Sequence, residues 1–365
     1  MNVGLQKMGT MGRLESITIM RGLAAFSVML FHLGSSGVLV SRSPELDGMF
    51  HYGFVGVPCF FVISGFVIPF SMHQTNYSIR DALPFFVRRL VRLEPCYLVT
   101  VAGTFAMLKI AEKAPSFNGQ HTAFDPVMLA SQVGYVAPWI GQPWLVIPAW
   151  TLAIEFQYYV LMLFLGHMLF SKRRALLAIP LVIAATTFLV FPDQRAVFKY
   201  LPCFAVGFSA FLLHQGRVGR ISFGALVSGF SLITAAALDP ASGLAALASS
   251  VAIFAPIKRR VALLSSLGAI SYSLYLVHAT VGGRIVSVCC RFTDLPGPLI
   301  LVFAVVGSIV AASVLWYFIE KPTANYARAI RSGKSRHTLR LRSIGVMGHG
   351  PPRYFETRAD EKPSI

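Results

Sequence analysis

The stretch from Met20 to His32, MRGLAAFSVMLFH, decides the fold of this chain. Arg21 and His32 are its two ionisable residues, and they stand eleven positions apart in an otherwise almost wholly apolar segment. Eleven residues make about three turns of an α-helix, so both side chains project from one face, about 16 Å apart along the axis. Ionisable groups are costly in a membrane helix and usually face a protein interior or a watery cavity. The alternative is that Arg21 extends to the membrane surface and His32 hydrogen-bonds a neighbouring helix.

Composition places the chain among membrane proteins. Hydrophobic residues make up 55% of the 365 residues and charged residues only 13%, against about 25% charged in soluble domains. The net charge of +17 is gathered in short clusters between apolar runs and in the C-terminal part. This pattern orients membrane proteins and differs from a nucleic-acid-binding stripe, so we expect no nucleic-acid partner. The five cysteines have no metal-ligand spacing, and we expect no metal site and no bound cofactor.

Ten apolar runs are long enough to predict membrane-spanning helices. They fall at about 17–36, 53–72, 93–112, 150–170, 175–191, 198–213, 221–238, 242–257, 264–288 and 298–319. Lys and Arg are frequent in alternate connections and in the C-terminal part, and sparse in the connections between. Because positively charged loops stay in the cytoplasm, the sequence predicts an all-α polytopic transmembrane helix bundle of about ten spans with both termini cytoplasmic.

The predicted organisation has three parts. A cytoplasmic N-terminus at 1–16 precedes a membrane domain at 17–322, and a basic tail follows at 323–365. The tail has no apolar period beyond about 333, and we expect it to be largely disordered. The long outer connection at about 113–149 is rich in Pro, Gly and aromatic residues. We expect this connection to fold back over the outer face and roof a cavity, although a plain surface loop is the alternative.

Small and basic residues mark the second and third runs. Ser64 and Gly65 stand together in the second run, where small side chains let a helix or a ligand approach the backbone. Arg88, Arg89 and Arg92 lie at the cytoplasmic edge of the third run. Arg88 and Arg92 share a helix face and could clamp a phosphate. The same cluster also fits an ordinary topology signal.

Two further runs carry ionisable or hydroxyl side chains. Glu155 follows Trp150 by five residues and therefore lies inside the membrane, where a carboxylate needs a partner. A structural ion pair would satisfy that need without any other role. In the ninth run, Tyr272 and Tyr275 share a face that could hydrogen-bond a polar ligand, and His278 follows them as a functional or a core histidine.

Taken together, these residues resemble the integral membrane acyltransferases called acyltransferase family 3. The matching segments follow the family's order over about 14–322 and are Arg21 with His32, FFVISGF at 60–66, Arg88-Arg89, Trp150-Thr151-Leu152 with Glu155, SYSLY at 271–275 with His278, and Glu320-Lys321-Pro322. The forms around Arg21 and Trp150 are most similar to the exopolysaccharide O-acetyltransferase branch. One departure is Ile17-Thr18-Ile19, which stands where many members have Leu-Asp-Gly. Any role of that aspartate is therefore absent.

The resemblance implies transfer of an acyl group, usually acetyl, from acyl-CoA to a hydroxyl of a sugar in a surface or exported glycan, at the cell inner membrane. The acceptor would be a carbohydrate or a lipid-linked glycan, and acetyl-CoA would be a donor substrate. The expected catalytic residues are His32, Glu155 and Arg21; Arg88, Arg89 and Arg92 would bind the donor; Ser64, Trp150, Tyr272, Tyr275 and His278 would shape the acceptor cavity.

His32 is expected to act as the general base, with a transient acyl-histidine as the other mechanism. Glu155 and His32 have similar predicted depths, so we expect them to face each other across one cavity. A different class of function stays open, because intramembrane ionisable residues also mark transport paths. That alternative is a transporter or flippase for a sugar or a lipid-linked glycan unit.

Overall fold

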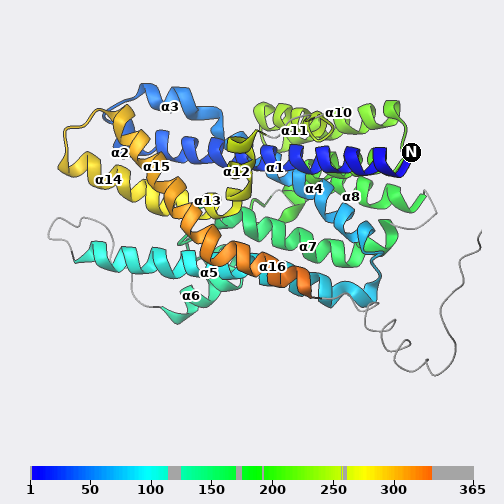
Figure 1. The fold of residues 1–365 in the computed structure, drawn as a ribbon, viewed down its shortest axis with the longest axis horizontal. Helices are drawn as coiled ribbons and strands as arrows, with labels where there is room; N and C mark the ends of the chain where they lie inside the picture. Colours follow the sequence, from blue (N-terminus) through cyan, green and yellow to red (C-terminus); the bar gives the residue numbers. More distant parts are fainter. Residues whose placement is uncertain are drawn as a thin grey trace, which may run out of the picture.

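The computed structural model describes residues 2–113, 125–169, 175–190, 193–255, 257 and 261–330. Within these ranges the regular structure is entirely helical, which confirms the all-α prediction. Helices α1 (Asn2–Gly34), α5 (Ala82–Glu112) and α7 (Ala149–Leu169) extend along the longest axis of the molecule (Figure 1). The predicted tail at 323–365 begins inside a described helix that ends at Ala329, and its residues 331–365 lie outside the described residues, as do the basic clusters at 172–174 and 258–260.

The remaining elements complete the bundle. The other long helices are α4 (Gly56–Gln74), α8 (Ala175–Val190), α9 (Leu201–His214), α10 (Arg220–Ala237), α11 (Pro240–Ala252) and α15 (Gly297–Leu315). The short α-helices are α2 (Gly37–Val40), α3 (Glu45–Phe50), α6 (Pro126–Val133), α12 (Ala262–Ala269), α13 (Ser271–Val277), α14 (Gly283–Phe292) and α16 (Lys321–Ala329). Single turns of 3₁₀-helix are η1 (His51–Val55), η2 (Ile79–Asp81), η3 (Ala137–Ile140) and η4 (Val197–Tyr200), and π-helical turns are η5 (His278–Gly282) and η6 (Trp316–Glu320).

Each of the ten predicted runs contains a helix. Among the described residues, eight helical segments are long and apolar enough to cross a membrane. The other two predicted spans correspond to α8 and α11, which have only 16 and 13 residues. The chain therefore has the helices of a multi-pass membrane protein, while ten spans and cytoplasmic termini stay predictions.

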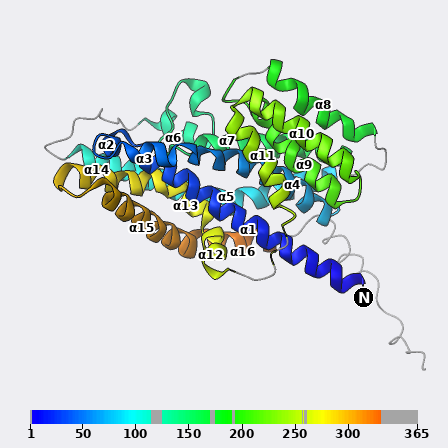
Figure 2. The same cartoon turned by 90° about the horizontal axis from the view of Figure 1, so that it is seen from above.

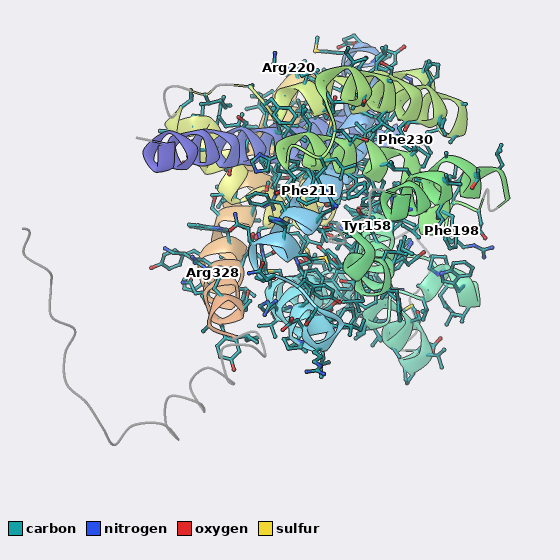
Figure 3. The ribbon with its side chains drawn as sticks, turned by 90° about the vertical axis from the view of Figure 1, so that its right-hand side faces the viewer. Tyr158, Phe198, Phe211, Arg220, Phe230 and Arg328 are labelled. Atoms are coloured by element: carbon teal, nitrogen blue, oxygen red, sulfur yellow. The ribbon has the colours of Figure 1, made fainter. Side chains whose placement is uncertain are left out.

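Two groups of helices each enclose an apolar core (Figure 2). The first core is formed mainly by α4, α7, α8, α9, α10 and α11, and contains Tyr158, Phe211 and Phe230 (Figure 3). The second is formed mainly by α1, α5, α13, α14 and α15. Helix α7 contributes buried residues to both cores, so it lies along the boundary between the two groups.

Small residues allow α4 and α9 to pack closely in the first group. A Cβ atom on Gly65 would lie 2.1 Å from the carbonyl oxygen of Phe204, and one on Gly207 would lie 1.9 Å from that of Val62. Any larger side chain at either position would push the two backbones apart. The predicted close approach at Gly65 is therefore confirmed, and the segment that approaches is another helix.

The ninth predicted run is not one continuous α-helix. It is divided into α12, α13, the π-helical turn η5 and α14. This division could not be predicted, because the composition stays largely apolar across it. π-Helical turns are rare and occur frequently at functional sites, because they rotate the side chains that follow them. Here the turn begins at His278.

Candidate active site

A cavity of about 260 Å³ lies where the two groups of helices meet. Residues from α1, α4, α5, α7 and α13 line it. Its polar side chains are Thr18, Arg21, Ser64, Arg89, Arg92, Thr151, Glu155, Tyr159, Ser271, Tyr272 and Tyr275. The structure therefore brings together side chains from five helices that are far apart in the sequence, and most of the predicted site residues are among them.

Glu155 is held in this cavity by two hydroxyl donors. Ser64 Oγ donates to Glu155 Oε1 over 3.0 Å, and the hydroxyl of Tyr159 donates to the same oxygen over 2.5 Å. Among the described residues, the other carboxylate oxygen accepts no hydrogen bond. Glu155 thus keeps one oxygen for a ligand or for an arginine, and Ser64 acts by fixing this carboxylate.

Three arginines line the cavity against one carboxylate. Arg21, Arg89 and Arg92 face it together with Glu155, so the lining side chains carry a formal charge of +2. Arg89 is further fixed by the ring of Tyr159, 5.4 Å from its guanidinium carbon. Glu320, which does not line the cavity, also interacts electrostatically with Arg21 and Arg92, so three arginines face two carboxylates and one positive charge stays unbalanced. Guanidinium groups in a partly buried site need anionic partners. The cavity therefore suits an anionic ligand.

Arg88 is not among the residues that line the cavity. Successive helix residues are about 100° apart, and the cavity-facing residues Arg89, Arg92 and Leu93 centre on a direction about 90° away from Arg88. Arg89 and Arg92 thus line the cavity and Arg88 does not, and donor binding by these arginines stays a prediction. The i,i+4 rule found residues on one face but could not show which face meets the cavity.

The hydroxyls of the two predicted tyrosines bond to protein atoms. Tyr272 donates to the carbonyl oxygen of Leu93 over 2.8 Å. Thr151 Oγ1 donates to the carbonyl of Pro148, so its 2.9 Å contact with Tyr275 must be donated by the tyrosine. Both rings line the cavity, but their hydroxyl protons serve to join helices.

His32 pairs with His278, and the contacts define which nitrogens carry protons. His278 Nδ1 lies 3.1 Å from the carbonyl oxygen of Leu274, which can only accept, so this nitrogen is protonated. In the neutral ring, His278 Nε2 must then accept the 3.0 Å hydrogen bond from His32 Nδ1. His32 in turn has its proton on Nδ1, and its Nε2 keeps a free lone pair. This is the arrangement of a base held in one tautomer by a second residue.

The predicted pairing of Glu155 with His32 is not present. Glu155 bonds to Ser64 and Tyr159, whereas His32 bonds to His278 and is not among the residues lining the cavity. Depth fixes only one coordinate, so two residues at one depth can lie on different sides of a bundle. The histidine pair lies just beyond the cavity, because the ring of Tyr275 lines the cavity and lies 5.9 Å from that of His278.

Trp150 faces away from this cavity. It lines a second cavity of about 350 Å³, together with Ala153 and Ile154 of the same helix. At about 100° per residue, these three positions centre on a direction about 130° around α7 from that of Thr151 and Glu155. The prediction that Trp150 and the tyrosines of α13 shape one cavity is wrong for this reason.

Four residues in or beside the site were missed from the sequence. Thr151 and Tyr159 lie four residues on either side of Glu155, so helical spacing could have identified them. Ser271 is fully buried and lines the cavity, and its hydroxyl has no hydrogen-bond partner among the described residues. Glu320 accepts from Ser273 Oγ over 2.7 Å and interacts electrostatically with Arg21. The sequence marks Glu320 only as part of the Glu320-Lys321-Pro322 motif and predicts no role for it.

Comparisons with known proteins show the family of this chain. The family model described as "Acyltransferase domain", that of acyltransferase family 3, matches residues 14–317, which is well over half of the chain. The chain belongs to acyltransferase family 3. No solved structure matches it significantly.

Three relatives illustrate the membership. The chain is 25% identical over 358 residues to the Bacillus subtilis (strain 168) protein named "Putative peptidoglycan O-acetyltransferase YrhL", covering 94% of this chain and 49% of that protein. It is 30% identical over 166 residues to "O-acetyltransferase OatA" of Staphylococcus aureus (strain NCTC 8325 / PS 47), covering 43% and 25%. It is 26% identical over 156 residues to "Acyltransferase MdmB" of Streptomyces mycarofaciens, covering 40% and 38%. The chain thus spans half or less of the length of each of these relatives.

Proposed function

We propose that this protein is a membrane O-acyltransferase that moves an acetyl group from acetyl-CoA to a hydroxyl of a sugar. The acceptor belongs to a surface or exported glycan, an exopolysaccharide or a lipid-linked unit, and the protein works from the cell inner membrane. The observation that carries the proposal is the positively charged cavity next to the histidine pair. Membership of the family and relatives named as O-acetyltransferases favour acyl transfer over transport.

The charge and size of the cavity suit the donor. Ligand pockets commonly measure about 300–1,000 Å³, and this cavity of about 260 Å³ is at the lower limit. It is too small for the whole of CoA but fits the narrow pantetheine arm with its acetyl group. The phosphates would remain at the mouth, where Arg89 and Arg92 can bind them bidentately. The thioester would then lie against Tyr275, the cavity residue beside His278.

The chemistry follows from the tautomer of His32. Nε2 removes the proton from the acceptor hydroxyl as its oxygen attacks the thioester carbonyl carbon. The tetrahedral intermediate then collapses, the carbon–sulfur bond breaks, and CoA leaves as a thiolate that takes up the proton from His32. His278 accepts the Nδ1 proton throughout and so positions the base. Arg21, beside Glu155, stabilises negative charge that develops in the cavity.

The test is acetyl transfer by the purified protein in lipid nanodiscs. Release of free CoA from acetyl-CoA and incorporation of labelled acetyl into an added oligosaccharide should both be detected. His32→Ala should lower the rate by about 10²–10⁴-fold, as loss of a general base commonly does. The matched control is His51→Ala, because His51 is an exposed histidine of η1. Equal CoA release by the wild type and by His32→Ala would contradict the proposed mechanism, and no acetyl transfer to any saccharide would contradict the proposed function.

A further inference from the structure

The second cavity, of about 350 Å³, lies on the other face of α7 and is lined mainly by aromatic rings. The rings belong to Tyr135, Trp139, Trp144, Trp150 and Tyr200. The chain has only four tryptophans, and three of them are here. They come from the connection before α7 and from its first turn, and Tyr200 comes from the turn before α9. Neither the proposed donor site nor the histidine pair makes use of this cavity.

Tryptophans near the end of a membrane helix often serve only as anchors at the bilayer surface. Anchoring residues are spread around the outside of a bundle, where each ring meets lipid headgroups. These rings instead converge on one concave space, and those of Trp150 and Tyr200 lie 5.7 Å apart. Convergence of this kind is a property of a binding site rather than of an anchor.

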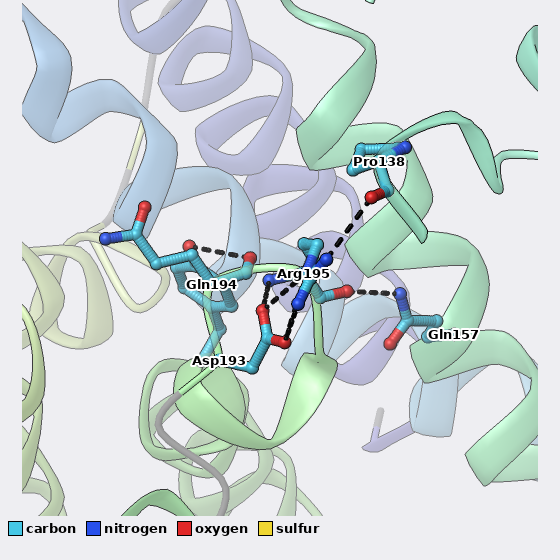
Figure 4. A network of polar contacts seen from close by, with 6 residues as sticks. Pro138, Gln157, Asp193, Gln194 and Arg195 are labelled. Carbon is cyan, nitrogen blue, oxygen red and sulfur yellow. Dashed lines mark hydrogen bonds and ion pairs between the residues drawn. The ribbon is translucent and has the colours of Figure 1, made fainter. Parts of the chain in front are cut away.

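Arg195 also lines the cavity, and Figure 4 shows the polar contacts that fix its position. The guanidinium of Arg195 lies 5.0 Å from the ring centre of Trp139, and it donates from Nε and Nη2 to the carboxylate of Asp193. Its Nη1 donates to the carbonyl of Pro138 over 3.2 Å, and its own carbonyl accepts from Gln157 Nε2 over 2.8 Å. These contacts join the two connections that form the cavity and hold the ring of Trp139 in place.

The same contacts define what Arg195 can offer a ligand. Its side chain has five N–H groups, and the hydrogen bonds to Asp193 and Pro138 use three of them in the described part of the chain. One N–H therefore remains on each Nη nitrogen. The hydrogen bonds from Arg195 hold the pKa of Asp193 below its ordinary value, so the carboxylate stays ionised. Arginine and aspartate then cancel in charge, and the cavity offers hydrogen bonds without a net charge.

This combination selects one class of ligand. A phosphate or other anion would gain little, because Asp193 already neutralises the guanidinium. An acyl chain would cover the free N–H groups without bonding them, which is unfavourable. A neutral sugar ring has an apolar face of C–H groups for the electron-rich faces of the aromatic rings, and hydroxyls at its edge for Arg195 and Gln194. We propose that the second cavity binds the neutral saccharide chain of the acceptor.

The position of the cavity suits that role, which rests on the proposed function. An α-helix with its side chains is about 10–12 Å thick, so the acceptor cavity and the donor cavity lie about that distance apart across α7. Tyr135 lines the acceptor cavity and also a small adjoining space that shares Arg89 and Glu155 with the donor cavity. Its φ of 56° is unusual for a residue with a side chain, and such strain is often found at functional sites. Sugar units next to the bound segment would thus lie near the donor.

Binding can be measured without any donor, by the intrinsic tryptophan fluorescence of the full-length protein in nanodiscs. Neutral oligosaccharides, namely chitotetraose, maltotetraose and cellotetraose, are added to millimolar concentration, with a short-chain phosphatidylglycerol as the lipid probe. We expect a saturable change with at least one saccharide and none with the lipid. Trp139→Ala should weaken that binding about tenfold or more, because stacking is lost.

The matched control is Trp316→Ala. Trp316 also carries a cation over its ring, with Lys321 Nζ at 5.2 Å, but it does not line the cavity. The Trp316→Ala variant should therefore have the same saccharide affinity as the wild type. Trp139 is 50% exposed, so its removal leaves little void, and Trp144→Ala provides a second cavity variant. No saturable response to any saccharide, an equal loss in the Trp139 and Trp316 variants, or a response to the lipid alone would overturn the inference.

The result is separable from the proposed function. Saccharide binding that depends on Trp139, without acetyl transfer, would leave the acceptor cavity standing and contradict the enzyme assignment. Acetyl transfer with a saccharide affinity that is the same in the Trp139 and Trp316 variants would contradict the acceptor cavity and leave the enzyme assignment standing.

Discussion

Removal of the His278 ring is the sharpest test of how His32 becomes a base. His278 Nε2 accepts the proton on His32 Nδ1, and this contact leaves His32 Nε2 without a proton. In His278→Ala, His32 loses the only partner among the described residues that fixes this tautomer through a side chain. His278 has no exposed surface, so the substitution leaves a void beside His32, whose remaining hydrogen-bond partner is the backbone of Val28.

The size of the effect follows from that hydrogen bond. Leaving a buried donor unsatisfied costs about 1–3 kcal/mol. If the backbone of Val28 does not replace the lost acceptor and the full cost falls on the reactive arrangement, the rate constant drops about 5- to 150-fold. His278→Gln should recover part of this loss, because the amide oxygen of glutamine can accept from His32 Nδ1 in place of the ring nitrogen. A merely structural role for His278 would not produce this rescue.

The assay is kcat for CoA release per folded molecule, with folding measured by size-exclusion chromatography of the same preparations. Leu276→Ala is the matched control, because Leu276 is also fully buried on α13 but belongs to the second core. It should lower stability, by about 2–5 kcal/mol, without lowering kcat of the folded fraction. Unchanged kcat in His278→Ala, or an equal loss in the glutamine variant, would refute the tautomer argument.

Three further predictions concern the donor cavity and the bundle. Arg89→Gln should raise the KM for acetyl-CoA about tenfold or more by removing a charged hydrogen bond, whereas Arg88→Gln, outside the cavity, should change it less than twofold. Glu155→Gln should keep its hydrogen bonds from Ser64 and Tyr159 and fold normally, yet lower kcat about tenfold or more; normal kcat would exclude a role for the charge. Gly65→Ala should lower the thermal midpoint, while Gly229→Ala, with open space around its Cβ position, should not.

Much of the fold could be predicted because it depends on one-dimensional properties. Apolar run length located the helices, since a membrane helix needs about 20 apolar residues whatever its neighbours. The same rule could not separate α8 and α11 from full spans, because a short apolar helix can also pack inside the bundle. In the turn η5, Gly282 packs against Ser308 of α15, a long-range contact that no local pattern encodes.

The residues that belong to the site could be predicted better than their arrangement in space. The cost of burying Arg21, Glu155 and His32 marked them as residues that need partners. Which partners they find depends on the rotation of each helix, and a sequence does not contain that angle. The carboxylate of Glu155 therefore accepts a hydrogen bond from Ser64 within the cavity, while His32 bonds to His278.

The two faces of α7 explain why one enzyme of this kind would keep two cavities. CoA is strongly anionic and calls for unbalanced arginines, whereas a neutral glycan is bound best where charges cancel. A single cavity for both ligands would either bind the anionic donor less tightly or surround the neutral sugar with buried charge. Residues spaced along α7 separate them, with Glu155 and Thr151 on the donor side and Trp150 on the other. With the proposed function, this separation would keep the thioester apart from the watery, glycan-filled space until an acceptor hydroxyl reaches His32, which would favour transfer over hydrolysis.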